Sequence, residues 1–204
     1  MQTTDRPYHH GNLRDTLIEA AVRLARAGGP DAVVLRAVSR EAGVSHNAAY
    51  RHFADHDDLL AAVSEYCMLQ LAALMTKRVN AVRVRGQKPR ASARLNAVGR
   101  AYVEFARTEP GWFKTAFSGA PGSPEVSAKG VAAPGPFDLL SARLDELVEA
   151  GVLPAQRRPG AEFAAWSMVH GLSTLLVDGP LRFLPDPEAA GLITAVLEVV
   201  KRGL

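Results

Sequence analysis

The stretch GVSHNAAYRHF, residues 43–53, places a glycine ahead of two histidines, an asparagine, an arginine and a tyrosine. It follows an apolar helical pattern over residues 35–42, in which Val38 points inward. The glycine permits a left-handed turn, after which Ala49 and Phe53 return apolar groups to a core. Two short helices joined by such a turn are typical of a helix-turn-helix.

The remaining side chains of this stretch lie on the outer faces of the second of these helices and its entry. They are Ser45, His46, Asn47, Ala48, Tyr50, Arg51 and His52. In a major groove, Asn pairs with adenine, Arg with guanine or phosphate, Ala with a thymine methyl group, and Tyr or Ser with phosphate oxygens. The stretch therefore indicates a DNA-reading helix; an ordinary solvated surface helix is the alternative.

Apolar residues recur at helical spacing along the chain, and no segment alternates as a strand does. The expected helices run from Leu13 to Gly28, Leu35 to Ala42, Ser45 to Arg51 or His52, Asp55 to beyond Leu74, Ala91 to Thr108, Pro110 to Phe117, Phe137 to Ala150, Pro159 to Asp178, and Pro187 to Arg202. Residues 118–136 hold four glycines and four prolines, which predicts a loop. We expect an all-α fold of about nine helices.

Composition bounds the class of protein. The 204 residues are 48% apolar and 22% charged, enough for a helical unit with a sizeable core, and the formal charge is only +3. No apolar run approaches the roughly 20 residues that span a bilayer, and the N-terminus lacks a signal-peptide core, so we expect a cytoplasmic location and no membrane partner. Cys67 is the only cysteine, which excludes an intramolecular disulfide or a cysteine-based zinc site. No motif indicates a cofactor or a metal.

Basic residues are concentrated between Lys77 and Arg100, where eight occur without an acidic one. This run is either an anion-binding strip or, as we favour, a solvated loop between helix ends.

Three segments resemble the signature of TetR-type transcriptional regulators. They are VSHNAAYRHFADHDDLL at 44–60, YHHGNLRDTLIEAA at 8–21 and LRAVSREAGVS at 35–45. Further on, WSMVHGL at 166–172 is similar to the Trp-x-x-x-His-Gly element of one class of ligand domain in that family. The resemblance implies a three-helix DNA-binding domain, residues 1–55, followed by a larger helical domain for ligand binding and dimerisation, residues 56–204.

The resemblance also implies roles for single residues. Ser45, Tyr50, His52 and the start of the fourth helix at His56 would contact phosphates, while His46, Asn47 and Arg51 would read base edges. His10 and Arg14 would touch the DNA backbone or an adjacent minor groove. Departures from this pattern, at Val34, Ser39, Ala48, Ala49 and His56, put the detailed base contacts in doubt: His56 stands where relatives usually carry Lys, and Ala48 lacks the hydroxyl that many relatives have.

A ligand pocket is implied between the fourth and eighth helices. Its candidates are Tyr66, Tyr102, Phe105, Trp112, Phe113, Phe117, Trp166 and His170. Aromatic residues at helical spacing are more often plain core, and the sequence does not say which of these line a pocket. His170 shares a helix face with Trp166; it is either a polar anchor for an effector or, as we favour, a buried histidine with a structural partner.

The last two helices are rich in apolar residues on several sides, so they need cover from more than one neighbour. The resemblance implies that they pair with a second copy, so that two reading helices face major grooves about 34 Å apart on a pseudo-palindromic DNA operator. We therefore expect a repressor that a small apolar or amphipathic effector releases from DNA.

Two other functions are considered. An architectural DNA-binding protein without an effector shares the N-terminal features but leaves the long helical remainder unexplained. A small helical enzyme could use Cys67 with His170, or Asp145 with Glu149, but Cys67 lies in an apolar helical run and the two acids lie on a polar helix side. We expect no catalytic residues.

Overall fold

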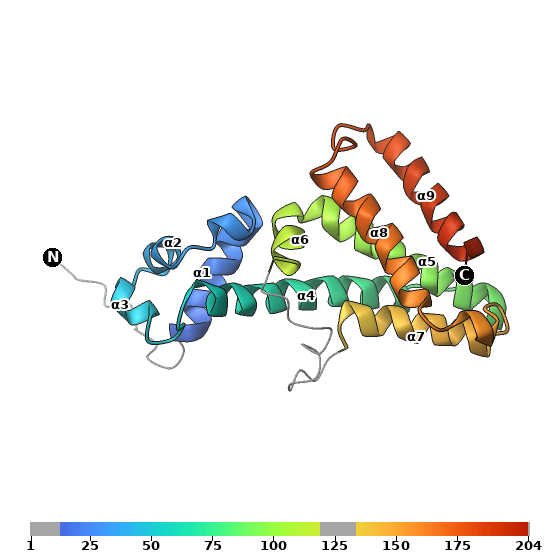
Figure 1. The fold of residues 1–204 in the computed structure, drawn as a ribbon, viewed down its shortest axis with the longest axis horizontal. Helices are drawn as coiled ribbons and strands as arrows, with labels where there is room; N and C mark the ends of the chain where they lie inside the picture. The colour runs from blue at the N-terminus through green and yellow to red at the C-terminus, as the bar shows by residue number, and fades with distance from the viewer. Residues whose placement is uncertain (1–12, 119–133, 204) are drawn as a thin grey trace.

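The fold is known from a computed structural model that describes residues 13–118 and 134–203. Within these ranges the chain forms nine α-helices, two short 3-10 turns and no strand, which confirms the all-α prediction (Figure 1). The elements are α1 (Leu13–Gly28), η1 (Pro30–Ala32), α2 (Leu35–Glu41), α3 (His46–Ala49), α4 (His56–Asn80), α5 (Gln87–Thr108), α6 (Pro110–Ala116), α7 (Pro136–Glu149), η3 (Ala155–Arg157), α8 (Ala161–Val177) and α9 (Asp186–Gly203).

Helices α1 to α3 form a small unit at one end of the molecule, which we call the head (Figure 1). The long helix α4 leaves the head and runs through the rest of the chain, the body, which contains α5 to α9. Helix α6 lies between the head and the other body helices, and α9 lies on the outside of the body beyond α8 (Figure 1).

Two apolar cores hold the chain together. The head core contains residues of α1 and α2, Ala49 and Phe53, and it continues along α4 as far as Cys67. The body core joins α4 to α9. Trp112 and Phe117 pack against both cores. A break between α3 and α4 lies at residues 50–55, and the first turns of α4 complete the head core.

Helix α4 is more apolar than the sequence analysis anticipated. Its mean hydropathy reaches 1.5 over 18 residues, so by length and composition alone, among the described residues, this one helix could cross a membrane. In the structure it packs against α1, α5, α6 and α7, which requires apolar residues on several sides. The same pattern is therefore that of a helix at the centre of a core.

Several helix ends differ from the predicted ones, and two of these differences have a clear physical reason. Helix α3 ends at Ala49 rather than at Arg51 or His52, because the chain tightens into a turn in which the His52 amide donates to the Ala49 carbonyl at 3.0 Å. This turn brings Phe53 back into the head core. Helix α5 begins at Gln87 rather than Ala91, since Pro89 lies in the first turn, where no amide donor is needed.

Candidate nucleic-acid interface and effector cavity

The turn between α2 and α3 has the conformation that the sequence predicts. Gly43 adopts a φ of 70°, in the left-handed region that favours glycine. The Val44 amide donates to the Ser39 carbonyl at 3.0 Å and closes the turn, while the buried Ser39 hydroxyl donates to the Leu35 carbonyl at 2.7 Å. These contacts fix the angle at which α3 leaves α2.

Helix α3 presents the predicted polar residues to solvent. Ser45 caps the helix, because its hydroxyl oxygen accepts from the Ala48 amide at 3.3 Å. The exposed side chains form what we call the reading surface: Ser45, Asn47, Tyr50, Arg51 and His52. His46 and Ala48 are partly buried, and the His46 ring meets the Tyr50 ring edge-on at 4.7 Å. The structure thus brings the predicted DNA-binding residues of this stretch together and places His46 behind Tyr50.

The other predicted DNA contacts have different settings. Arg14 is exposed on α1, and its guanidinium lies 5.1 Å from the centre of the Phe53 ring, beside the turn that follows α3. His10 lies outside the described residues. His56 is exposed at the start of α4, with its Nδ1 atom 3.1 Å from the Asp57 carboxylate.

Carboxylates occupy the N-terminus of α4. The Asp55 carboxylate accepts from the Asp58 amide at 2.9 Å, and the Asp58 carboxylate accepts from the Ala54 amide at 3.1 Å. These charges complement the helix dipole. A phosphate that approaches His56 meets them, so this contact has less electrostatic support than those of the reading surface.

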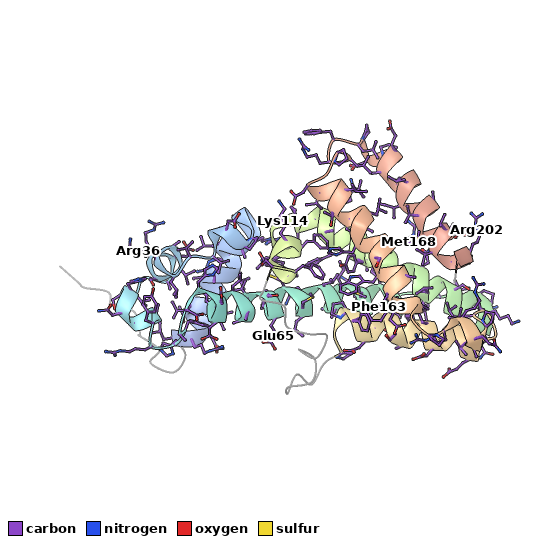
Figure 2. The ribbon with its side chains drawn as sticks, viewed as in Figure 1. Arg36, Glu65, Lys114, Phe163, Met168 and Arg202 are labelled. Carbon is purple, nitrogen blue, oxygen red and sulfur yellow. The ribbon has the colours of Figure 1, made fainter. Side chains whose placement is uncertain are left out.

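Sequence reasoning did not single out two arginines on α2. Arg36 and Arg40 are exposed and lie one helical turn apart, and Figure 2 shows Arg36 projecting from the head. The sequence could have indicated this pair, because basic residues four positions apart share a helix face. They add positive charge to the element that packs against α3.

In the body, a chain of hydrogen bonds links α5 to α8. The Trp166 indole Nε1 donates to the Tyr102 hydroxyl oxygen at 3.1 Å, and that oxygen lies 2.8 Å from Nδ1 of His170. Burial raises the pKa of the Tyr102 hydroxyl and lowers the pKa of the His170 imidazole. Both groups are therefore neutral at pH 7. The structural partner of His170 is thus a tyrosine hydroxyl.

A cavity of about 220 Å³ lies between α6 and the second half of α8. Its lining residues are Phe113, Lys114, Phe117, His170, Thr174, Val177 and Asp178. The His170 ring lies 4.8 Å from the Phe117 ring and 5.5 Å from the Phe113 ring. Lys114, visible on α6 in Figure 2, forms an ion pair with Asp178 at 2.6 Å. The cavity is thus mostly apolar, with one imidazole and one internal ion pair.

Some of the predicted ligand residues lie at the cavity, and the others lie near the head or in the body core. Tyr102 and Trp166 adjoin the cavity through His170. Tyr66 and Trp112 meet edge-on at 5.8 Å near the head, and Phe105 is buried in the body core. Sequence reasoning missed the non-aromatic lining residues Lys114, Thr174, Val177 and Asp178. Thr174 and Val177 could have been predicted, because positions 170, 174 and 177 share one helix face.

Helix α6 contacts the cavity on one side and the head on the other. A Cβ atom at Gly111 would lie 2.3 Å from the carbonyl oxygens of Ala25 and Arg26, so the backbones of α6 and α1 are in close contact. The Trp112 indole donates to the Val22 carbonyl at 2.9 Å. Arg26 also pairs with Glu109 at 2.5 Å. These contacts attach α6 to the end of α1.

Of the residues considered for catalysis, Cys67 is buried and Asp145 is paired with another side chain. Cys67 is buried in the head core, and burial raises the pKa of its thiol to about 12, which keeps it protonated and unreactive at neutral pH. Asp145 forms an ion pair with Arg158 at 2.7 Å.

The basic run between Lys77 and Arg100 spans the end of α4, the turn after it and part of α5, and acidic residues of the body partly neutralise it. Arg78 pairs with Glu104, and Arg94 pairs with Glu146 at 2.9 Å. Arg85, in the turn between α4 and α5, and Lys88, in the first turn of α5, remain exposed at the end of the molecule opposite the head (Figure 1).

Helices α8 and α9 expose apolar side chains on the outside of the body. On α8 these include Phe163, Met168 and Leu175, the first two of which are labelled in Figure 2, and on α9 Val199 is exposed. The opposite side of each helix is buried in the body core. We call the exposed side of this helix pair the outer face.

Comparison with known proteins gives this arrangement a family. Residues 17–63 match the model of bacterial regulatory proteins of the tetR family, and residues 95–199 match that of the Tetracyclin repressor-like C-terminal domain. None of the curated proteins matches the chain significantly.

Solved structures agree with these matches. A protein of unknown function from Rhodococcus sp. RHA1 is 30% identical, covers 98% of this chain and 99% of its own, and superposes with a TM-score of 0.76. The transcriptional regulator FadR from Bacillus subtilis, in complex with stearoyl-CoA, shares the fold at 17% identity, over 93% and 98% of the two chains, with a TM-score of 0.67. A TetR variant from Acinetobacter baumannii, in complex with minocycline, shares it at 15% identity, over 93% and 94%, with a TM-score of 0.63. With both of its halves matched in this way, the chain belongs to the TetR family of bacterial regulatory proteins.

Proposed function

We propose that the protein is a homodimeric repressor that binds a pseudo-palindromic DNA operator through its head and leaves it when a small molecule occupies the body. The observation that carries this proposal is the reading surface, which presents five polar side chains on a short helix, its cap and the turn that follows it, after a glycine turn. A surface of this composition offers donors and acceptors to base edges and phosphates.

Within the reading surface, the side chains divide by chemistry. Asn47 and Arg51 carry the groups that pair with adenine and guanine edges in the major groove. Ser45, Tyr50 and His52 supply donors for phosphate oxygens, which position the head on the duplex. His46 supports Tyr50 through the edge-on contact at 4.7 Å.

Dimerisation through the outer face supplies the second head. The exposed apolar residues of α8 and α9 need cover from water, and a second copy related by a two-fold axis covers both helices at once. Two heads then read half-sites about 34 Å apart.

Release by an effector requires that the cavity and the head be connected. The ligand-bound FadR and TetR relatives support an effector site in this fold. Helix α6 lines the cavity with Phe113 and Phe117 and touches α1 through Gly111. A ligand that prefers a conformer with α4 tilted and α6 displaced changes the separation of the two heads, and its effect is limited by that preference.

Gel retardation with DNA selected by the purified protein tests the proposal. Arg51→Ala and Tyr50→Ala are expected to abolish retardation while leaving the thermal melt and the dimer intact. Arg85→Ala removes the same charge as Arg51→Ala from the opposite end of the molecule and is expected to bind normally. Equal losses in Arg51→Ala and Arg85→Ala would contradict a role for α3.

The architectural alternative predicts a different result in the same assay. Such a protein would retard unrelated DNA as tightly as the selected site at physiological salt, and no compound would release it. A large preference for the selected site, lost on adding one member of a compound library, supports the regulator.

A further inference from the structure

The hydrogen bonds around Tyr102 have a fixed direction. The indole nitrogen of Trp166 only donates, so the Tyr102 oxygen accepts from it at 3.1 Å. The hydroxyl proton of Tyr102 then needs an acceptor of its own, because a buried hydroxyl that lacks one is costly. Within the described residues, the remaining partner is Nδ1 of His170, at 2.8 Å. Tyr102 therefore donates to His170.

This direction decides which nitrogen of His170 carries the proton. A neutral imidazole that accepts at Nδ1 carries its hydrogen on Nε2. The opposite tautomer would make the Tyr102 oxygen accept twice and leave its own proton without an acceptor. No hydrogen bond to Nε2 occurs among residues 13–118 and 134–203, and His170 lines the cavity. Among the described residues, this series of hydrogen bonds therefore ends in an N–H donor without a protein acceptor, on a residue that lines the cavity.

The rest of the lining selects against charge. Lys114 and Asp178 neutralise each other at 2.6 Å, so an anion gains little from the ammonium and is repelled by the carboxylate. The Thr174 hydroxyl donates to the His170 carbonyl at 3.1 Å, so its proton is already used. Phe113 and Phe117 supply apolar ring surface against the imidazole.

The cavity is small and partly open to solvent. Its volume of about 220 Å³ is below the roughly 300–1,000 Å³ that is usual for drug-sized ligands, which favours a single ring with a short substituent.

From these observations we propose that the effector is a neutral, single-ring compound with a carbonyl-type acceptor, which receives a hydrogen bond from Nε2 of His170. The proposal rests on the proposed function, since it identifies the chemical class that the body would sense.

Three fluorinated probes of similar shape test it by fluorine NMR on the full-length protein. They are 4-fluoroacetophenone, 1-ethyl-4-fluorobenzene and 4-fluorobenzoate, which differ in having a neutral acceptor, no acceptor or a negative charge. We expect the ketone to bind about 2- to 10-fold more tightly than the hydrocarbon, the range that one net hydrogen bond supplies, and more tightly than the carboxylate. Tightest binding by the carboxylate, equal binding of ketone and hydrocarbon, or no binding up to the solubility limit would each overturn the proposal.

Two measurements on His170 make the test specific. The His170→Phe variant keeps a ring but removes the donor, and it is expected to erase the ketone's advantage over the hydrocarbon. Long-range nitrogen–proton NMR correlations of the unmodified protein identify the tautomer without any substitution, and a proton on Nδ1 would overturn the proposal even if the variant fails to fold.

Gel retardation of the same samples separates this proposal from the proposed function. A protein that binds its selected DNA but shows no preference for the ketone retains the proposed function and loses this inference. A protein that prefers the ketone but binds no DNA retains the ligand chemistry, and the proposed function fails.

Discussion

At the scale of single residues, Phe53 is where the reading helix is attached to the head. Its side chain is fully buried, with 0% exposure, although it follows three exposed polar residues. Because the tight turn after α3 exists to return this ring to the core, the position of the reading surface depends on it.

Replacing Phe53 by Ala is expected to cost about 3–5 kcal/mol of unfolding free energy, since it leaves a cavity in the head core. Urea denaturation measures the loss. Phe183, which is 79% exposed, provides the matched control, and Phe183→Ala is expected to change stability by less than about 0.5 kcal/mol. Similar losses in the two variants would show that burial does not govern the head.

The burial of His170 makes the free energy of unfolding depend on pH, and the direction of this dependence can be stated. Burial lowers its pKa below the ordinary value of 6.5, so the unfolded chain binds the proton at a higher pH than the folded chain does. Stability is therefore lost as the pH falls below 6.5 towards the folded pKa. We expect the protein to lose more stability than a His170→Gln variant when urea denaturation is repeated at about pH 5.5 instead of about pH 7.5. Equal losses would contradict the buried, neutral imidazole.

At the scale of elements, helix α6 contacts the head on one side and lines the cavity on the other. Its Gly111 position allows backbone contact with the carbonyl oxygens of Ala25 and Arg26, which no larger residue allows. The same short helix supplies Phe113 and Lys114 to the cavity. A displacement of α6 on one side must therefore change its contacts on the other.

Gly111→Ala is expected to destabilise the protein by about 1–3 kcal/mol, because the added methyl group forces α6 away from α1. It should also weaken operator binding, since α1 supports the reading helix. Pro110→Ala, at the exposed neighbouring position, is the control and should be close to neutral. Thermal melts and gel retardation of both variants provide the measurement, and a neutral Gly111→Ala would contradict the close contact.

The helices also show which parts of the fold could be predicted from the sequence. The helix-turn-helix followed from local rules, because the left-handed glycine and the serine cap act within a few residues. The end of α3 did not follow from local rules, because it depends on the burial of Phe53 in the head core. The start of α5 was predicted four residues too late, at Ala91, although a first helical turn accepts a proline such as Pro89.

The cavity was only partly predictable for the same reason. Phe113 and Phe117 are one turn apart and His170 marks α8, so their residue types drew attention. Which candidates face the cavity depends on how α6 packs between α1 and α8. That packing places Trp112 against Val22 and buries Phe105 in the body core, and neither outcome is visible in local spacing.

At the scale of the whole molecule, the outer face predicts the oligomeric state. Leu175 is 41% exposed on α8, and Leu175→Glu would place a charge within the proposed dimer interface. We expect this variant to be monomeric by light scattering and to lose operator affinity on the order of 100-fold, because the two heads are no longer linked. Val84, which is 42% exposed near the basic turn, provides the control Val84→Glu, which should remain dimeric. A monomeric Leu175→Glu protein that retains full affinity would contradict operator binding as a dimer.

Trp112 and Phe117 pack against both cores, and α4 contributes to each of them. Neither part of the chain can melt without exposing apolar surface of the other, so a single cooperative transition is expected on heating. We therefore expect a compound bound in the body to protect the head from proteolysis, even while, under the proposed function, it lowers the head's affinity for DNA.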